Sequence, residues 1–304
     1  MNRRPSSLIV VMLCLMSAAW LFRPAALYAH GVVGKRLFVE PIATEDANVF
    51  SEFDLVVPSY VKGDHENELS IGSALTLQLT SRLGLEMEGE WVSLNPDIGS
   101  NESGWANPEA VLKYVAFTSP EHEWIATVAA GAEFPYGTKR IGADDFWTLK
   151  TGFFYGKGFG DLPGRLAFLR PLMIQGDGMI HQPLTGSATE GFCTLSYDLA
   201  VYYSIPYLQQ FVKDVGIPRP LNRLFPMVEL NYERVLNGPD LGNLEGFARP
   251  GLLWVGRSVE LGVAAVIPIT EAAREKADIG VTGIVSLYLD DMFPDAFRKP
   301  LFER

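Results

Sequence analysis

The stretch Leu83–Leu94, with the sequence L-G-L-E-M-E-G-E-W-V-S-L, decides the fold. Apolar side chains occupy odd-numbered positions and glutamates occupy the even-numbered positions between them: Leu83, Leu85, Met87 and Trp91 against Glu86, Glu88 and Glu90. Successive side chains of a β-strand point to opposite faces, whereas a helix would mix these two sets. The stretch therefore predicts a strand with one apolar and one acidic face.

The same alternation recurs along the chain between Gly, Pro, Asn and Asp residues. Clear cases begin at Leu69, Phe192, Met227 and Ile279. With weaker segments included, the pattern predicts about twelve strands. They begin near Phe53, Leu69, Leu83, Glu109, Trp124, Phe146, Leu166, Phe192, Met227, Phe247, Val259 and Ile279.

The connections between these segments alternate in length. Long polar connections at 95–107, 135–145, 182–191 and 237–245 follow odd-numbered strands, and most even-numbered strands end in short turns. Transmembrane barrels have long outer loops and short periplasmic turns. The long connection 205–224 departs from this rule, and we predict a short periplasmic helix near 207–215 within it.

These features favour an all-β, antiparallel transmembrane barrel over a soluble sandwich or lipocalin-like barrel. Ordinary strands run to about 5–6 residues, whereas a tilted membrane strand needs about 9–11. In lipid every backbone polar group must be paired internally, so the strands must close on themselves. Residues 51–290 are therefore expected to form the barrel.

The ends of the chain are predicted from composition. Residues 1–29 combine Arg3 and Arg4, an apolar run from Leu8 to Phe22 and a small residue, Ala29. This pattern is typical of a secretory signal peptide cleaved near Ala29. Residues 30–50 are expected to form a periplasmic segment or a lumen plug, and residues 291–304 a C-terminal periplasmic tail.

Overall composition excludes several classes. The chain has 304 residues, of which 48% are hydrophobic, and a formal net charge of −11. The apolar content excludes a disordered chain. The acidic balance argues against a nucleic-acid partner, which favours a basic surface.

Six glutamates are predicted to line the lumen, because a charge on the lipid face of a barrel is costly. They are Glu86, Glu88, Glu90, Glu229, Glu233 and Glu260. Two interpretations stay open at this point. The glutamates form a lining that favours cations, or they form a solvated wall paired with Lys113, Arg170 or Arg249.

Other candidate chemistry is sparse. His30 would begin the mature chain, so its amine and imidazole are a candidate copper site, with His122 as a second ligand. His65 and His181 are placed in outer loops. No histidine lies in a recognisable serine-hydrolase motif, and we expect neither enzymatic activity nor a cofactor.

Four stretches carry a family resemblance: His30–Arg36, Tyr155–Pro163, Arg249–Arg257 and Leu289–Pro294. They resemble uncharacterised bacterial outer-membrane, transporter-like barrels allied with the MetA-pathway of phenol degradation family. The resemblance implies a barrel with a transport role and carries over no catalytic residue.

The function predicted from the sequence is a narrow outer-membrane channel or transporter for a small solute, either apolar and aromatic or cationic. The alternatives are a structural surface barrel with a filled lumen and a copper-binding protein using His30. Expected partners are outer-membrane lipid, lipopolysaccharide, the outer-membrane assembly machinery and the solute.

Overall fold

The computed structural model describes residues 31–303 except 64 and 186–190. The predicted signal peptide, its cleavage site at Ala29 and His30 therefore lie outside the described residues. Within the described part, no helix combines the length and the apolar character needed to cross a membrane.

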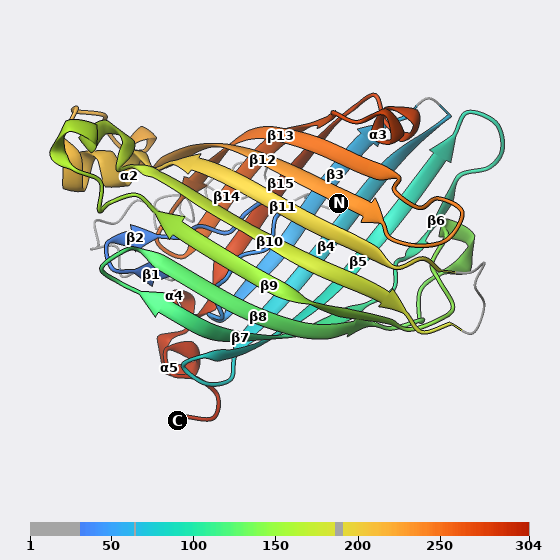
Figure 1. Ribbon diagram of the computed structural model, residues 1–304, viewed down its shortest axis with the longest axis horizontal. Helices are drawn as coiled ribbons and strands as arrows, with labels where there is room; N and C mark the ends of the chain where they lie inside the picture. Colours follow the sequence, from blue (N-terminus) through green and yellow to red (C-terminus); the bar gives the residue numbers. More distant parts are fainter. Residues whose placement is uncertain (1–30, 64, 186–190, 304) are drawn as a thin grey trace, which may run out of the picture.

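Twelve antiparallel strands form a closed barrel (Figure 1). Each strand pairs with the next one along the barrel, β15 pairs with β3, and β4 pairs with β5. The strands are β3 (Glu52–Lys62), β4 (Glu66–Gln78), β5 (Leu83–Pro96), β7 (Glu109–Ser119), β8 (Trp124–Glu133), β9 (Thr148–Gly158), β10 (Leu172–Pro183), β11 (Thr194–Tyr203), β12 (Leu224–Val235), β13 (Leu244–Val255), β14 (Val259–Pro268) and β15 (Ile279–Tyr288).

Short elements decorate the two ends of the barrel. The hairpin β1–β2 and the helices α2, η2, η3, η4, α4 and α5 lie at one end, and β6, η1 and α3 lie at the other (Figure 1). Their bounds are β1 (Val32–Val33), β2 (Arg36–Leu37), β6 (Glu102–Trp105), η1 (Lys139–Ile141), η2 (Gly164–Leu169), α2 (Ile205–Tyr207), η3 (Leu208–Val212), η4 (Leu221–Arg223), α3 (Glu271–Lys276), α4 (Leu289–Met292) and α5 (Pro294–Phe297).

Most of the longer loops lie at the end that carries β6 and α3, which we call the outer end, and the opposite end is the inner end. The connections 159–171 and 204–223 are the exceptions and lie at the inner end. The helix predicted near 207–215 is present at the inner end, where α2 and η3 run from Ile205 to Val212. It begins where the Ser204 hydroxyl accepts a hydrogen bond from the Tyr207 N–H.

The seventh strand begins later than predicted. We expected it near Leu166, but residues Gly164–Leu169 form η2 and β10 begins at Leu172. Pro171 has no backbone N–H to give to a ladder, and it stands directly before the first strand residue. The apolar character of residues 166–169 therefore belongs to a helical turn at the inner end.

The alternation predicted from sequence sorts side chains between the two faces of the wall. Outward-facing apolar residues are exposed on the barrel surface and form its lipid-facing belt, for example Leu69, Ile71, Met87, Leu112, Val128, Phe153, Val201, Val228, Val263 and Val281. A large exposed apolar surface of this kind needs an apolar surrounding.

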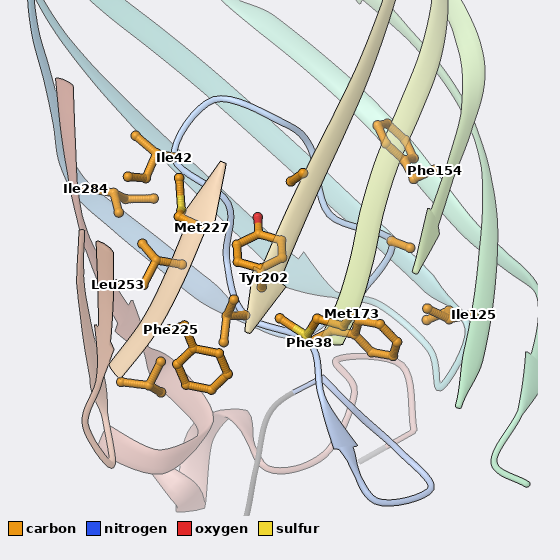
Figure 2. Close-up of a cluster of buried hydrophobic side chains, with 14 of the residues drawn as sticks. Phe38, Ile42, Ile125, Phe154, Met173, Tyr202, Phe225, Met227, Leu253 and Ile284 are labelled. Atoms are coloured by element: carbon orange, nitrogen blue, oxygen red, sulfur yellow. The ribbon is translucent and has the colours of Figure 1, made fainter. Parts of the chain in front are cut away.

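The interior of the inner half is filled by the chain itself. Residues 31–51, which we call the inner segment, run inside the barrel, where Phe38, Val39, Ile42 and Val49 are buried. Figure 2 shows Phe38 beside Met173, and Ile42 near Met227 and Ile284.

Glycines on the inner face of the wall make room for the inner segment. A Cβ atom on Gly84 would lie 2.8 Å from the Cβ of Val49, and one on Gly156 would lie 2.8 Å from the Phe38 ring. Both contacts are too close for a real Cβ atom, so these wall positions accept the segment only as glycine.

Candidate functional site: an acidic outer cavity above the inner segment

A cavity of about 1320 Å³ occupies the outer half of the barrel. Its walls include the outer ends of β4, β5, β7 and β8, and residues 40–45 of the inner segment form its floor. The described residues that line it include twelve Asp or Glu side chains but only two permanent cations, Arg249 and Lys276. The cavity is therefore strongly acidic.

The glutamates of β5 run from this cavity toward its floor. Glu86, Glu88 and Glu90 all line it. Glu86 is the deepest of the three and is 7% exposed. Neither Glu88 nor Glu90 forms an ion pair with any residue in the described part of the chain, and both carboxyl groups line the cavity.

A single lysine neutralises the deep end of the acidic stripe. Lys113 Nζ lies 2.5 Å from a Glu86 oxygen and 2.9 Å from a Glu45 oxygen, which joins the wall to the inner segment. The Thr76 hydroxyl donates a further hydrogen bond to Glu86. Lys113 is almost fully buried, and an ammonium in such a place needs paired carboxylates.

Glu229 and Glu260 have a different role from the one expected for open lumen residues. Glu229 is fully buried, and its carboxylate accepts hydrogen bonds from the backbone N–H groups of Ile42, Ala43 and Thr44 at 2.8, 2.9 and 3.1 Å. Glu260 is also fully buried and accepts a hydrogen bond from the Tyr288 hydroxyl at 2.5 Å. Both face the interior, but the inner segment covers them.

Glu233 and the three described histidines lie on different elements of the barrel. Glu233 is exposed near the outer end of β12. His65 lies in the outer loop between β3 and β4, as predicted. His181 lies within β10 and not in a loop, with its Nε2 atom 3.1 Å from the Ser196 hydroxyl oxygen. His122 lies in the inner turn after β7 and contacts Asp161.

Further wall residues hold the backbone of the inner segment. Gln175 donates a hydrogen bond from its side-chain amide to the Val39 carbonyl, and the Thr127 hydroxyl donates one to the Ala47 carbonyl. Asp177 accepts a hydrogen bond from the Glu45 N–H. None of these three residues was predicted from the sequence. Polar side chains at inward positions of otherwise apolar strands were the available signal.

A second set of contacts fixes the hairpin β1–β2 at the inner end. Arg36 is fully buried and donates two hydrogen bonds to one Glu123 oxygen, at 2.9 and 3.1 Å. It also donates to the Arg170 and Pro171 carbonyls, and its guanidinium lies 3.8 Å from the centre of the Tyr207 ring. Burial lowers the pKa of the Arg36 guanidinium, and the Glu123 carboxylate opposes that effect.

Tyr207 completes this contact from helix α2. Its hydroxyl donates a hydrogen bond to Glu123 at 2.9 Å. Burial and that hydrogen bond raise the pKa of Tyr207 to about 12, so the hydroxyl remains a donor. Arg36, Glu123 and Tyr207 together form what we call the inner latch.

Comparisons with solved structures identify the barrel type. The structure is similar to the COG4313 outer membrane channel from Pseudomonas putida F1, with a TM-score of 0.55 and 14% identity over 83% of this chain and 99% of that chain. The fold is that of a bacterial outer-membrane barrel.

Other solved structures are less alike. LpxR from Salmonella typhimurium has a TM-score of 0.41 with 11% identity, over 78% of this chain and 100% of that chain. Outer membrane phospholipase A from Escherichia coli has a TM-score of 0.40 with 9% identity, over 78% of this chain and 96% of that chain. No protein-family model and no curated protein matches the sequence, so no match supports the MetA-pathway resemblance.

Proposed function

We propose that this protein is an outer-membrane channel for small cationic solutes, with passage controlled by the inner segment. The observation that carries the proposal is the acidic cavity of about 1320 Å³ that opens at the outer end. A cleft lined by one sign of charge, with walls of low dielectric constant, concentrates ions of the opposite sign.

The arrangement of the glutamates supports a cationic over an apolar solute. Glu90 and Glu88 place carboxyl groups without an ion-pair partner among the described residues along the cavity wall, and the paired Glu86 lies below them. A cation that moves inward along β5 meets carboxylate oxygens before it reaches the segment at the floor. Passage then requires residues 40–45 to move away from Glu229.

The filled inner half supports a second candidate, a structural barrel that transports nothing. In that case the hydrogen bonds of Glu229 and the inner latch would be permanent. Measurement of ion conductance separates the two candidates, because a permanently filled barrel conducts no ions.

We further propose that the protein is not an enzyme and that copper binding at His30 is the least supported alternative. The contact between His181 and Ser196 faces the lumen, and neither residue lines the outer cavity. Contacts with lipopolysaccharide and with the assembly machinery remain part of this proposal, whereas a lipid environment follows from the barrel fold.

The proposal is tested by planar-bilayer recordings on the refolded chain under a salt gradient. Wild-type protein should show steps that favour cations, and the double variant E88Q/E90Q should lose most of that preference. The matched control E121Q/E233Q removes two glutamates outside the cavity lining and should keep the preference. Selectivity unchanged in E88Q/E90Q, or a folded barrel without conductance, would overturn the proposal.

A further inference from the structure

Three carboxylates converge where the inner segment meets the start of the barrel wall. Glu40 and Asp46 belong to the inner segment, and Glu52 is the first residue of β3. One oxygen from each lies within 4.8 Å of the others. Asp46 is 4% exposed and Glu52 is 8% exposed, whereas Glu40 is partly exposed at the floor of the outer cavity. We call this group, which an ion could reach from the cavity, the carboxylate triad.

The triad has weaker contact with positive charge than a neighbouring acidic group. Glu45, Glu86 and Glu88 also lie together, and there Lys113 contacts two of the three carboxylates at 2.9 and 2.5 Å. With the triad, Lys113 forms one long ion pair, 4.0 Å from an Asp46 oxygen. The two acidic groups therefore differ in how closely a cation of the protein approaches them.

The oxygens of the triad are also short of hydrogen-bond donors. Glu52 is 8% exposed, and its carboxylate takes part in no hydrogen bond or ion pair among the residues that the structure describes. One Glu40 oxygen is buried without a hydrogen-bond partner. Asp46 is better supplied, because both the side-chain amide of Asn48, at 2.6 Å, and the Asn48 backbone N–H donate to it. Buried carboxylate oxygens without donors are costly unless a cation binds them.

We propose that the carboxylate triad binds a calcium ion, which fastens the inner segment to β3. Calcium prefers carboxylate and carbonyl oxygens at about 2.3–2.6 Å, so oxygens on opposite sides of the ion are about 5 Å apart. The three triad oxygens lie within 4.8 Å of one another, so a single ion of this size can contact all of them. Without His or Cys, the triad does not suit softer metals.

The site would make the position of the inner segment depend on divalent cations. Two of its ligands lie on the segment and one lies on the wall, so binding and docking of the segment stabilise each other. This inference concerns how the segment is held and does not depend on which solute the channel passes.

The test is calorimetric titration of the refolded, chelator-treated full chain with CaCl₂ in detergent free of lipopolysaccharide. We expect saturable binding of about one ion per chain. E52Q and E40Q should each weaken that binding by about tenfold or more. E121Q, which removes an exposed carboxylate from the inner turn after β7, is the matched control and should bind calcium as the wild type does.

Hydrogen exchange of residues 38–50 gives a second readout that a surface-bound ion would not produce. Calcium should slow exchange there in the wild type and the E121Q control but not in E52Q. The absence of saturable binding by the wild type would overturn the proposal, as would equal affinity in E40Q and the control. Glu40 lies outside the barrel ladder, so E40Q decides the question even if E52Q does not fold.

Discussion

At the scale of single residues, inward-facing side chains on the wall hold the inner segment by its backbone. Glu229 is the clearest case, because one carboxylate accepts three consecutive backbone N–H groups. A charged acceptor suits this place since it accepts hydrogen bonds at both oxygens. In a glutamine at this position, an NH2 group would replace one carboxylate oxygen. That donor would face the backbone N–H donors of the inner segment, and their hydrogen bonds would be lost.

We predict that Glu229→Gln loosens the inner segment without opening the barrel wall. The loss of buried hydrogen bonds should cost about 1–3 kcal/mol. Hydrogen exchange at residues 42–44 should become faster by the corresponding factor, while exchange in β12 and β13 stays slow. Glu233→Gln, an exposed change on the same strand, is the control. Equal protection of residues 42–44 in the two variants would contradict this role of Glu229.

The sequence predicted which way Glu229 points but not what it contacts. Period-two alternation places it on the lumen face, because that inference needs only the neighbouring residues along one strand. Its partners Ile42 and Thr44 stand more than 180 positions earlier in the chain. No local pattern encodes such a distant contact, so Arg36 and Glu123 were likewise not predicted as a pair.

At the scale of elements, the strands were largely predictable and the inner segment was not. Strands such as β5, β7, β8, β14 and β15 begin at the residues expected from alternation. The inner segment has little regular structure apart from the two-residue strands of β1–β2. Because the segment has no periodicity, its sequence gives no signal for its partners. Two interpretations of residues 30–50, a lumen plug and a periplasmic segment, therefore remained possible from the sequence.

We predict that replacing residues 32–49 by a Gly/Ser linker of equal length opens the lumen. The twelve strands pair with each other and not with the segment, so the ladder should persist. Bilayer recordings should then show larger and steadier conductance than the wild type. The shift in gel mobility on heating would verify that the barrel is folded. Conductance equal to that of the wild type in a folded variant would show that the segment does not block passage.

At the scale of the whole molecule, the balance of charge inside the barrel links docking of the segment to pH. Burial, followed by the charge of Glu52, raises the pKa of Glu40 well above its ordinary value of 4.5. Burial also raises the pKa of Asp46 above 3.8, although Lys113 opposes it. The groups that face them are Glu52 and Asp54 on β3, Glu86 on β5 and Lys113 on β7.

We predict that acidification closes the channel. Between their ordinary and raised pKa values, Glu40 and Asp46 bind more protons when the inner segment is docked than when it is released from the wall. Docking of the segment therefore strengthens as the pH falls through the raised pKa values. The gain should level off below pH 4.5, the ordinary pKa of Glu40. Conductance recorded in the presence of a chelator, so that no divalent cation competes with protons at Glu40 and Asp46, should fall reversibly between neutral pH and that value. A conductance that rises on acidification in a folded barrel would contradict the assigned sign.

The connection of the inner segment to β3 also sets an order of events in folding. β3 closes the cylinder by pairing with β15, yet the groups that grip the segment lie on β8, β10 and β12. The segment can therefore dock only after β8, β10 and β12 have assembled, either before the β3–β15 seam forms or through the inner end of the closed barrel. Contacts so distant along the chain form slowly. We therefore expect a folding intermediate to accumulate in which the barrel is nearly complete but the inner segment is still undocked, and we expect proteases to cleave that exposed segment.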